Sequence, residues 1–151
     1  MAGRLSFGIF LSSVLFLGLS GNQVFAQTAY VSNEKDNTIS VVDLASLKVI
    51  KTFKVGKRPR AIILSKDQSK LYICASDSDT VQILDLTSGK IIQNLPSGDD
   101  PEQFALHPDG KRLFIANEDD NQVTVLDVET GLVIIEIPVG IEPEGVAISP
   151  D

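Results

Sequence analysis

A repeat of 42 residues is the feature that most limits how this chain can fold. Three phrases align without a gap, and they begin at Ala29, Leu71 and Leu113. They read AYVSNEKDNTISVVDLASLKVIKTFKVGKRP, LYICASDSDTVQILDLTSGKIIQNLPSGDDP and LFIANEDDNQVTVLDVETGLVIIEIPVGIEP. A period of this length indicates one supersecondary unit that buries its apolar face only by stacking on its neighbours.

Each unit predicts four short strands. In the second unit, runs rich in Val and Ile lie near residues 60–65, 71–75, 80–86 and 90–95, separated by polar or Gly-containing turns. The runs VVDL, ILDL and VLDV place apolar residues on both faces, so both faces must be covered. Four-stranded sheets at a period of about 40 to 45 residues, stacked around an axis, are the blades of a β-propeller. We therefore predict an all-β fold with WD40-like blades.

The predicted blades are too few to close the ring of a propeller. Residues 29–59 form blade 1 without its innermost strand, residues 60–101 form blade 2, and residues 102–143 form blade 3. Residues 144–151 begin blade 4, with an innermost strand over residues 145–149. Because propellers commonly need about 4 to 8 blades for closure, residues 27–151 are expected to be an N-terminal fragment of a larger propeller.

A secretory signal peptide is predicted for residues 1–26. Arg4 precedes an apolar run, no acidic residue comes before Glu34, and the small Ala26 fits cleavage before Gln27. The run is shorter than the roughly 20 apolar residues of a membrane-spanning helix. We expect export to the periplasm and no membrane association after cleavage.

Charge and motifs exclude several classes of function. Without residues 1–26, 12 Lys and Arg face 20 Asp and Glu, a net charge of −8. An acidic protein repels phosphate backbones, so nucleic acid is not an expected partner. Cys74 is the single cysteine of the sequence, and it aligns with small residues on a predicted buried strand. The sequence has no Cys-x-x-Cys-His motif and no Gly-rich phosphate loop, and we expect no cofactor.

The last turn of each unit carries an aspartate. Asp43, Asp85 and Asp127 occupy the same position in LASLK-, LTSGK- and VETGL-type turns, and we expect each to bond local amides rather than to form a catalytic set. Gly89 suits a positive φ in the second turn, whereas Leu47 replaces it in the first and predicts a turn that is more strained or of another type.

Neither His107 nor the acidic loops predict a metal site. His107 precedes a Pro-Asp-Gly turn, with no second His in the sequence and no nearby Cys. The clusters SDSD and NEDDN do not continue into a calcium-binding loop with its central Gly and closing Glu.

Charged loops are predicted to share one face of the disc, as a rim. They are the loops that enter the innermost strands and those that join the second and third strands. An acidic rim with a basic notch at Lys57, Arg58 and Arg60 would steer charged partners, unless these charges only keep the protein soluble. The predicted binding residues are Lys57, Arg58, Arg60, Asp99, Asp100, Glu102, Glu118, Asp119, Glu142 and Glu144.

The phrases YVSNEKDNTISVVD, YICASDSD, FALHPDGKRLFIANEDDN and IPVGIEPEGVAISPD resemble the YVTN β-propeller repeat. They are most similar to the exported seven-bladed propeller proteins associated with PQQ-dependent catabolism of alcohols. The resemblance covers residues 28–151. It implies seven blades and a periplasmic accessory protein that works beside a quinoprotein alcohol dehydrogenase or a c-type cytochrome, and it carries over no catalytic residue.

Three functions follow from these observations. The favoured one is a non-catalytic accessory protein for interaction or ligand binding, not an enzyme, because no nucleophile and base stand at workable spacing. The alternative is a lactonase-like propeller hydrolase with its active site in the axial channel, where Glu142, Glu144 and Arg60 are the nearest charged groups. The second alternative is a surface or adhesive repeat protein.

Overall fold

The structure, a computed structural model, describes residues 27–150 and consists almost entirely of strands. The predicted signal peptide, residues 1–26, lies outside the described residues. Within the described part, no helix has both the length and the apolar character of a membrane span. The elements are β1 (Thr28–Asn33), β2 (Thr38–Asp43), β3 (Lys48–Lys54), β4 (Pro59–Leu64), β5 (Lys70–Ala75), a 3-10 turn (Ser76–Ser78), β6 (Thr80–Asp85), β7 (Lys90–Pro96), β8 (Pro101–Leu106), β9 (Arg112–Asn117), β10 (Gln122–Asp127) and β11 (Leu132–Pro138).

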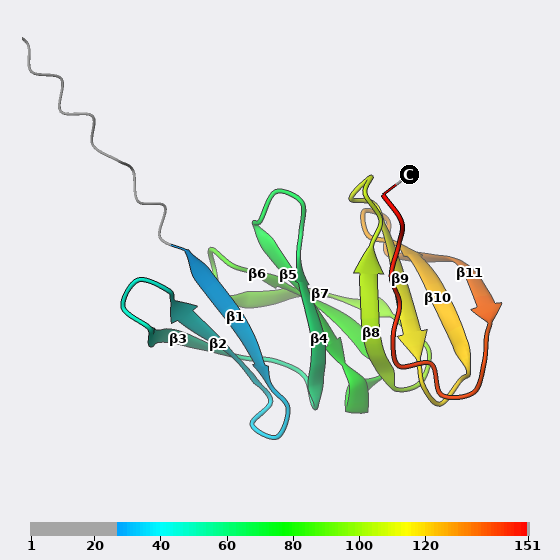
Figure 1. Cartoon of the computed structure of the whole chain (residues 1–151), viewed down its shortest axis with the longest axis horizontal. Coiled ribbons are helices and arrows are strands. Elements are labelled where there is room, and N and C mark those ends of the chain that lie inside the picture. Colours follow the sequence, from blue (N-terminus) through cyan, green and yellow to red (C-terminus); the bar gives the residue numbers. More distant parts are fainter. Residues whose placement is uncertain (1–26, 151) are drawn as a thin grey trace, which may run out of the picture.

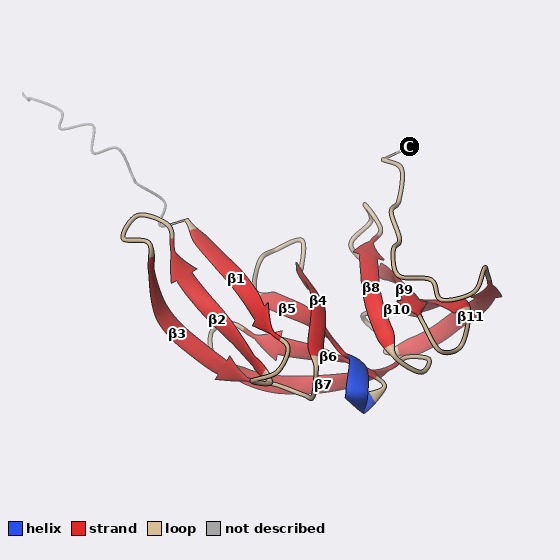
Figure 2. Ribbon diagram, turned by 60° about the horizontal axis from the view of Figure 1, so that its bottom comes forward, coloured by secondary structure: helices blue, strands red, loops and turns tan. Residues whose placement is uncertain are grey.

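The strands form three antiparallel sheets that succeed one another along the chain. Blade 1 has the order β1-β2-β3, blade 2 the order β4-β5-β6-β7, and blade 3 the order β8-β9-β10-β11. The sheets fan out side by side in chain order (Figures 1 and 2). Strand β4 lies against β8 on one side and against β1 on the other. The predicted all-β propeller architecture is confirmed, and the four strands predicted in the second unit are observed as β4 to β7.

One predicted strand is not observed. Residues 144–150 contain no strand, although an innermost strand was expected over residues 145–149. A β-carbon added at Gly145 would meet no atom within 4 Å, and most residues of the segment are exposed. An extended segment without a neighbouring strand has no partner for its backbone hydrogen bonds and does not form a ladder.

The core lies between the blades. Strand β5 is buried almost throughout, and alternate side chains serve the two neighbouring interfaces. Leu71 and Ile73 pack toward blade 1, whereas Tyr72 and Cys74 pack toward blade 3. The outer face of blade 3 has no covering sheet among the described residues, and β11 is exposed along its whole length.

The turn aspartates act as the sequence predicts. The Oδ1 atom of Asp85 accepts a hydrogen bond from the main-chain N–H of Ser88 at 2.7 Å, and Asp43 and Asp127 form equivalent bonds in their own turns. These bonds to neighbouring groups lower the pKa of each of the three carboxyls. Leu47 has a φ of 53°, where Gly89 has 69°, so a leucine does occupy the left-handed region in the first turn.

Candidate active site

The rim loops repeat one backbone arrangement. The residue just before each repeated proline donates its main-chain N–H to an Asn or Asp side chain that ends the loop between the second and third strands of the preceding blade. All six residues have positive φ, between 48° and 57°. This arrangement places the loops on one face, as predicted, and holds the side chains before the prolines in equivalent positions. The donor and acceptor pairs are Arg58–Asn37 (2.9 Å), Asp100–Asp79 (3.2 Å) and Glu142–Asn121 (2.9 Å).

Arg58 is the centre of an ion-pair network across the rim. Its Nη1 lies 3.0 Å from Asp100 Oδ2, and its Nη2 lies 3.1 Å from Glu102 Oε1. Its guanidinium also faces Glu34, at 3.4 Å from Nε, and Asp77, at 3.5 Å from Nη1. The hydrogen bond with Asp100 is the largest influence and raises the pKa of Arg58. This arginine is therefore permanently charged and is held by carboxylates.

The prediction of a basic notch needs correction. Arg58 and Arg60 do not form an isolated basic patch, because both lie in ion pairs with carboxylates of neighbouring blades. Arg60 forms an ion pair with Glu102 and lies 3.6 Å from Glu34. Lys57 lines a separate depression beside Glu34. Glu34 was not among the predicted rim residues, although it occupies the same repeat position as Glu118, which was.

Glu102 is the most buried acid of the network. Its side chain is only 3% exposed, and it lies on the innermost strand β8 between the guanidinium groups of Arg58 and Arg60. Burial raises its pKa to about 6, with a further contribution from the charge of Asp100, while the two arginines act in the opposite direction. Among carboxyl groups, a pKa near neutrality is typical of acid–base catalysts.

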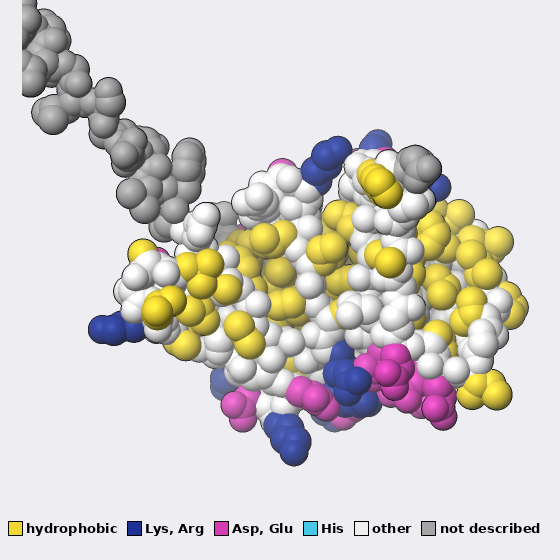
Figure 3. All heavy atoms as spheres, viewed as in Figure 1, with side chains coloured by type: hydrophobic (Ala, Val, Ile, Leu, Met, Phe, Trp, Pro, Cys, Tyr) yellow, Lys and Arg dark blue, Asp and Glu magenta, His cyan; other side chains and the backbone are white. Residues whose placement is uncertain are grey.

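A groove opens beside Glu102 where the innermost strands meet. It has a volume of about 380 Å³, and its walls include Glu34, Arg60, Gln103 and Glu144. Figure 3 shows Asp, Glu, Lys and Arg side chains gathered along the lower edge of the molecule, in the region of these loops. The groove therefore combines a buried carboxylate with a guanidinium at a site open to small molecules.

The other predicted rim residues fall into two groups. Asp100, Glu102 and Glu118 each offer an oxygen within 4.8 Å of the others, which suits a hard cation, but guanidinium groups already neutralise Glu102. Asp99 and Asp119 lie apart, in a cluster with Asp120 that raises the pKa of Asp99. The side chains of these two, and of the exposed Glu142, are not among those that line the groove.

Stacked four-stranded sheets, with a charged groove between their innermost strands, define the protein as a β-propeller with a candidate axial site. A family model described as "Lactonase, 7-bladed beta-propeller" matches residues 25–134, and the chain belongs to this family. A search of curated proteins found no match.

Two solved structures illustrate the likeness. The hydrazine synthase of Kuenenia stuttgartiensis superposes with a TM-score of 0.72 at 26% identity, over 78% of this chain and 34% of that one. The dihydro-heme d1 dehydrogenase NirN in complex with DHE has a TM-score of 0.63 at 19% identity, over 75% of this chain and 24% of that one, and this likeness shows the fold alone. The chain thus spans about a third or less of these proteins.

The prediction that the protein is not an enzyme is wrong. The family whose model matches the chain is named for lactonases. No nucleophile and base stand close together along the sequence. The groove instead takes its charged groups from repeat-related loops of different blades, so that spacing along the chain does not reveal it.

Proposed function

We propose that the protein is a propeller hydrolase that opens lactone rings at the groove beside Glu102. The observation that carries this proposal is a buried carboxylate with a pKa of about 6, in contact with two arginines and lining a groove at the innermost strands. Family membership supports the same reaction class.

Hydrolysis of a lactone needs a base for water and a positive group for the carbonyl oxygen. Glu102 is the base: its carboxylate removes a proton from water as the water oxygen attacks the carbonyl carbon. Arg60 lines the same groove, and its guanidinium stabilises the negative charge that develops on the carbonyl oxygen. The ring C–O bond then breaks, and the protonated Glu102 returns its proton to the leaving alkoxide, which yields a hydroxy acid.

The surrounding carboxylates favour release of the product. A lactone without charged substituents enters the groove without repulsion, whereas the product carries a carboxylate at neutral pH. Glu34 and Glu144 line the groove and repel that anion. Arg58 is a positioning residue, because it holds Glu102 and Asp100 in place through its two Nη atoms.

The test measures hydrolysis of δ-valerolactone and γ-butyrolactone by the full-length protein in a pH-stat. We expect Glu102→Gln to lower kcat by about 10²- to 10⁴-fold, as loss of a general base does. The value of kcat/KM should rise as the pH passes about 6 and then level off, since the base must be ionised.

The matched control is Glu136→Gln, which changes an exposed acid on β11 outside the groove and should leave the rate unchanged. Circular dichroism and elution volume check that both variants fold. A full-length protein that opens neither lactone faster than buffer, or a folded Glu102→Gln variant that retains the wild-type rate, would contradict the proposal.

Export to the periplasm stays a prediction from residues 1–26. Association with a quinoprotein alcohol dehydrogenase or a c-type cytochrome stays a prediction from the resemblance described above. Neither is needed for lactone hydrolysis at the groove.

A further inference from the structure

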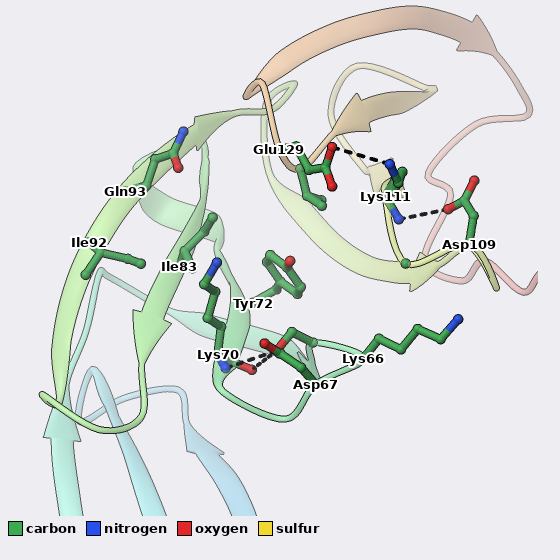
Figure 4. Close-up of a pocket in the computed structure, with 13 residues that line it drawn as sticks. Lys66, Asp67, Lys70, Tyr72, Ile83, Ile92, Gln93, Asp109, Lys111 and Glu129 are labelled. Atoms are coloured by element: carbon green, nitrogen blue, oxygen red, sulfur yellow. Dashed lines mark hydrogen bonds and ion pairs between the residues drawn. The ribbon is translucent and has the colours of Figure 1, made fainter.

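A second and larger groove lies between blades 2 and 3. Its volume is about 490 Å³, within the roughly 300 to 1,000 Å³ typical of small-molecule sites. It is formed by the loops β4–β5 and β8–β9 and by the turn β10–β11, which lie at the ends of the strands opposite the rim. It is therefore separate from the groove beside Glu102. Figure 4 shows side chains of both blades facing this space.

The floor of the groove is apolar except for the hydroxyl of Tyr72. Tyr72 is 4% exposed and Ile83 is 3% exposed, and both belong to the core between the two blades. Val128 and Ile92 extend this lining toward the opening. Burial, with a smaller contribution from Asp67, raises the pKa of Tyr72, so that its hydroxyl stays protonated and can donate a hydrogen bond.

The carboxylates around the groove are engaged with their own neighbours. Asp67 accepts hydrogen bonds from the hydroxyls of Ser65 (2.6 Å) and Ser69 (2.8 Å), which lower its pKa to about 2. Asp109 binds Arg112 at 2.9 Å from Nε. Glu129 lies 3.5 Å from the ammonium of Lys111.

Two of the lysines at the groove lack such a partner. Among residues 27–150, neither Lys66 nor Lys70 has a carboxylate within ion-pair distance, and Lys66 donates only to the main-chain oxygen of Pro108, at 3.2 Å. The lining holds equal numbers of lysines and carboxylates, but the ammonium groups of Lys66 and Lys70 make no direct ion pair within the described part of the chain and keep N–H donors free. A carboxylate of a bound ligand would complement them.

The two interfaces between blades differ at repeat-related positions on the fourth strand. Between blades 1 and 2, Phe53 fills the equivalent place, and the ammonium of Lys51 lies 4.4 Å from the centre of its ring. Phe53 packs so closely that a β-carbon on Gly89 would lie 2.7 Å from it. Between blades 2 and 3, the smaller Leu95 and the neutral Gln93 occupy the corresponding positions, facing Gly131. Gln93 lines the groove, whereas Leu95 is buried in the core between the two blades.

We propose that this groove is a ligand site for a small organic anion that carries a carboxylate on an apolar body. The carboxylate binds the ammonium of Lys70 and the hydroxyl of Tyr72, and the apolar body packs on Ile83, Val128 and Ile92. Gln93 offers a further amide for a polar substituent. The site does not depend on lactone hydrolysis at the rim.

The experiment follows tyrosine signals by NMR in the full-length protein with carbon-13-labelled tyrosine rings. Tyr72→Phe assigns the Tyr72 signals. Benzoate is the probe, and benzamide is its neutral counterpart of the same shape. We expect benzoate to shift the Tyr72 signals in a saturable manner and benzamide to bind at least about tenfold more weakly, because it cannot form the ion pair.

Variants test whether the ammonium of Lys70 binds the carboxylate of benzoate. Lys70→Gln should weaken benzoate binding about tenfold or more. The control Lys48→Gln removes an exposed lysine at the start of β3 and should leave binding unchanged. Glu102→Gln should also leave it unchanged, which separates this site from the rim. The proposal is overturned if benzoate causes no saturable shift at Tyr72, if benzamide binds equally well, or if Lys70→Gln binds benzoate like the wild type.

Discussion

The turns at the two ends of the strands differ in how well their residues are repeated from blade to blade. In the outer turns, the same aspartate recurs in every blade and caps its own turn. At the rim, the backbone repeats equally well, but the side chain before the proline is Arg58 in one blade and Asp100 in the next. Residues that only close a turn thus stay the same in every blade. At the rim, by contrast, different side chains occupy positions with the same backbone geometry, and these differences produce its chemistry.

This exchange of charge links neighbouring blades. Arg58 and Asp100 are 42 residues apart, one full repeat, and their side chains bond directly. Arg60 and Glu102 lie two residues after Arg58 and Asp100, so they are also one repeat apart, and they form an ion pair as well. If all blades carried the same residue at these positions, like charges would face one another around the axis. The difference between blades is what permits a buried carboxylate at the rim.

The largest effect on stability is expected from removing both arginines. Arg58→Met combined with Arg60→Met leaves Glu102 buried without a counter-charge, and we expect a loss of about 3 kcal/mol in the free energy of unfolding at pH 8. Glu102 has a pKa of about 6 in the folded protein, and this value rises further without the arginines. At pH 5 the carboxyl is protonated and neutral, so the loss should be smaller there.

Urea titrations of the full-length protein at the two pH values measure this difference. Adding Glu102→Gln to the double variant removes the charge, and it should recover part of the stability at pH 8 but little at pH 5. An equal loss at both pH values would show that the arginines stabilise the rim by packing rather than by charge.

A smaller effect is expected at the other end of the strands. Asp85→Ala removes a cap of the β6–β7 turn, and we expect the melting temperature to fall by about 2 to 4 °C with no change in lactone hydrolysis. Because hydrogen bonds lower the pKa of Asp85, its contribution is present above the ordinary aspartate value of 3.8 and is lost as the pH falls further.

Differential scanning calorimetry of Asp85→Ala and of the equivalent Asp127→Ala tests this point. Similar decreases for both variants would confirm that the blades use these aspartates in the same way. A loss of lactone hydrolysis in either variant would contradict the separate roles of these turns and of the rim.

The repeat made most of the fold predictable. The period of 42 residues places the strands of blade 2 to within one residue at each end, and the turn chemistry of Asp85 and Gly89 follows from residue type alone. These features depend on local backbone preferences and on apolar patterning, which a single sequence displays directly.

The site was only partly predictable, for physical reasons. The sequence placed Arg60 and Glu102 on one face but did not show that they bond, because an ion pair between blades depends on how closely two separate sheets approach. The pKa of Glu102 depends mainly on its burial, which arises only when β4 and β8 meet.

The smallest effect is expected where the outer turns themselves differ. Leu47 is 78% exposed and has a φ of 53°. The left-handed conformation is sterically unfavourable for leucine, and burial of its side chain offsets little of this penalty. Leu47→Gly removes that cost but adds freedom to the unfolded chain, and we expect a net gain of about 0.5 kcal/mol. The reciprocal change, Gly89→Ala, should destabilise the protein by more, because the added β-carbon would lie 2.7 Å from Phe53 as well as at positive φ. Urea midpoints of the two variants against the wild type measure both effects, and a destabilised Leu47→Gly variant would show that this leucine contributes packing that outweighs its backbone strain.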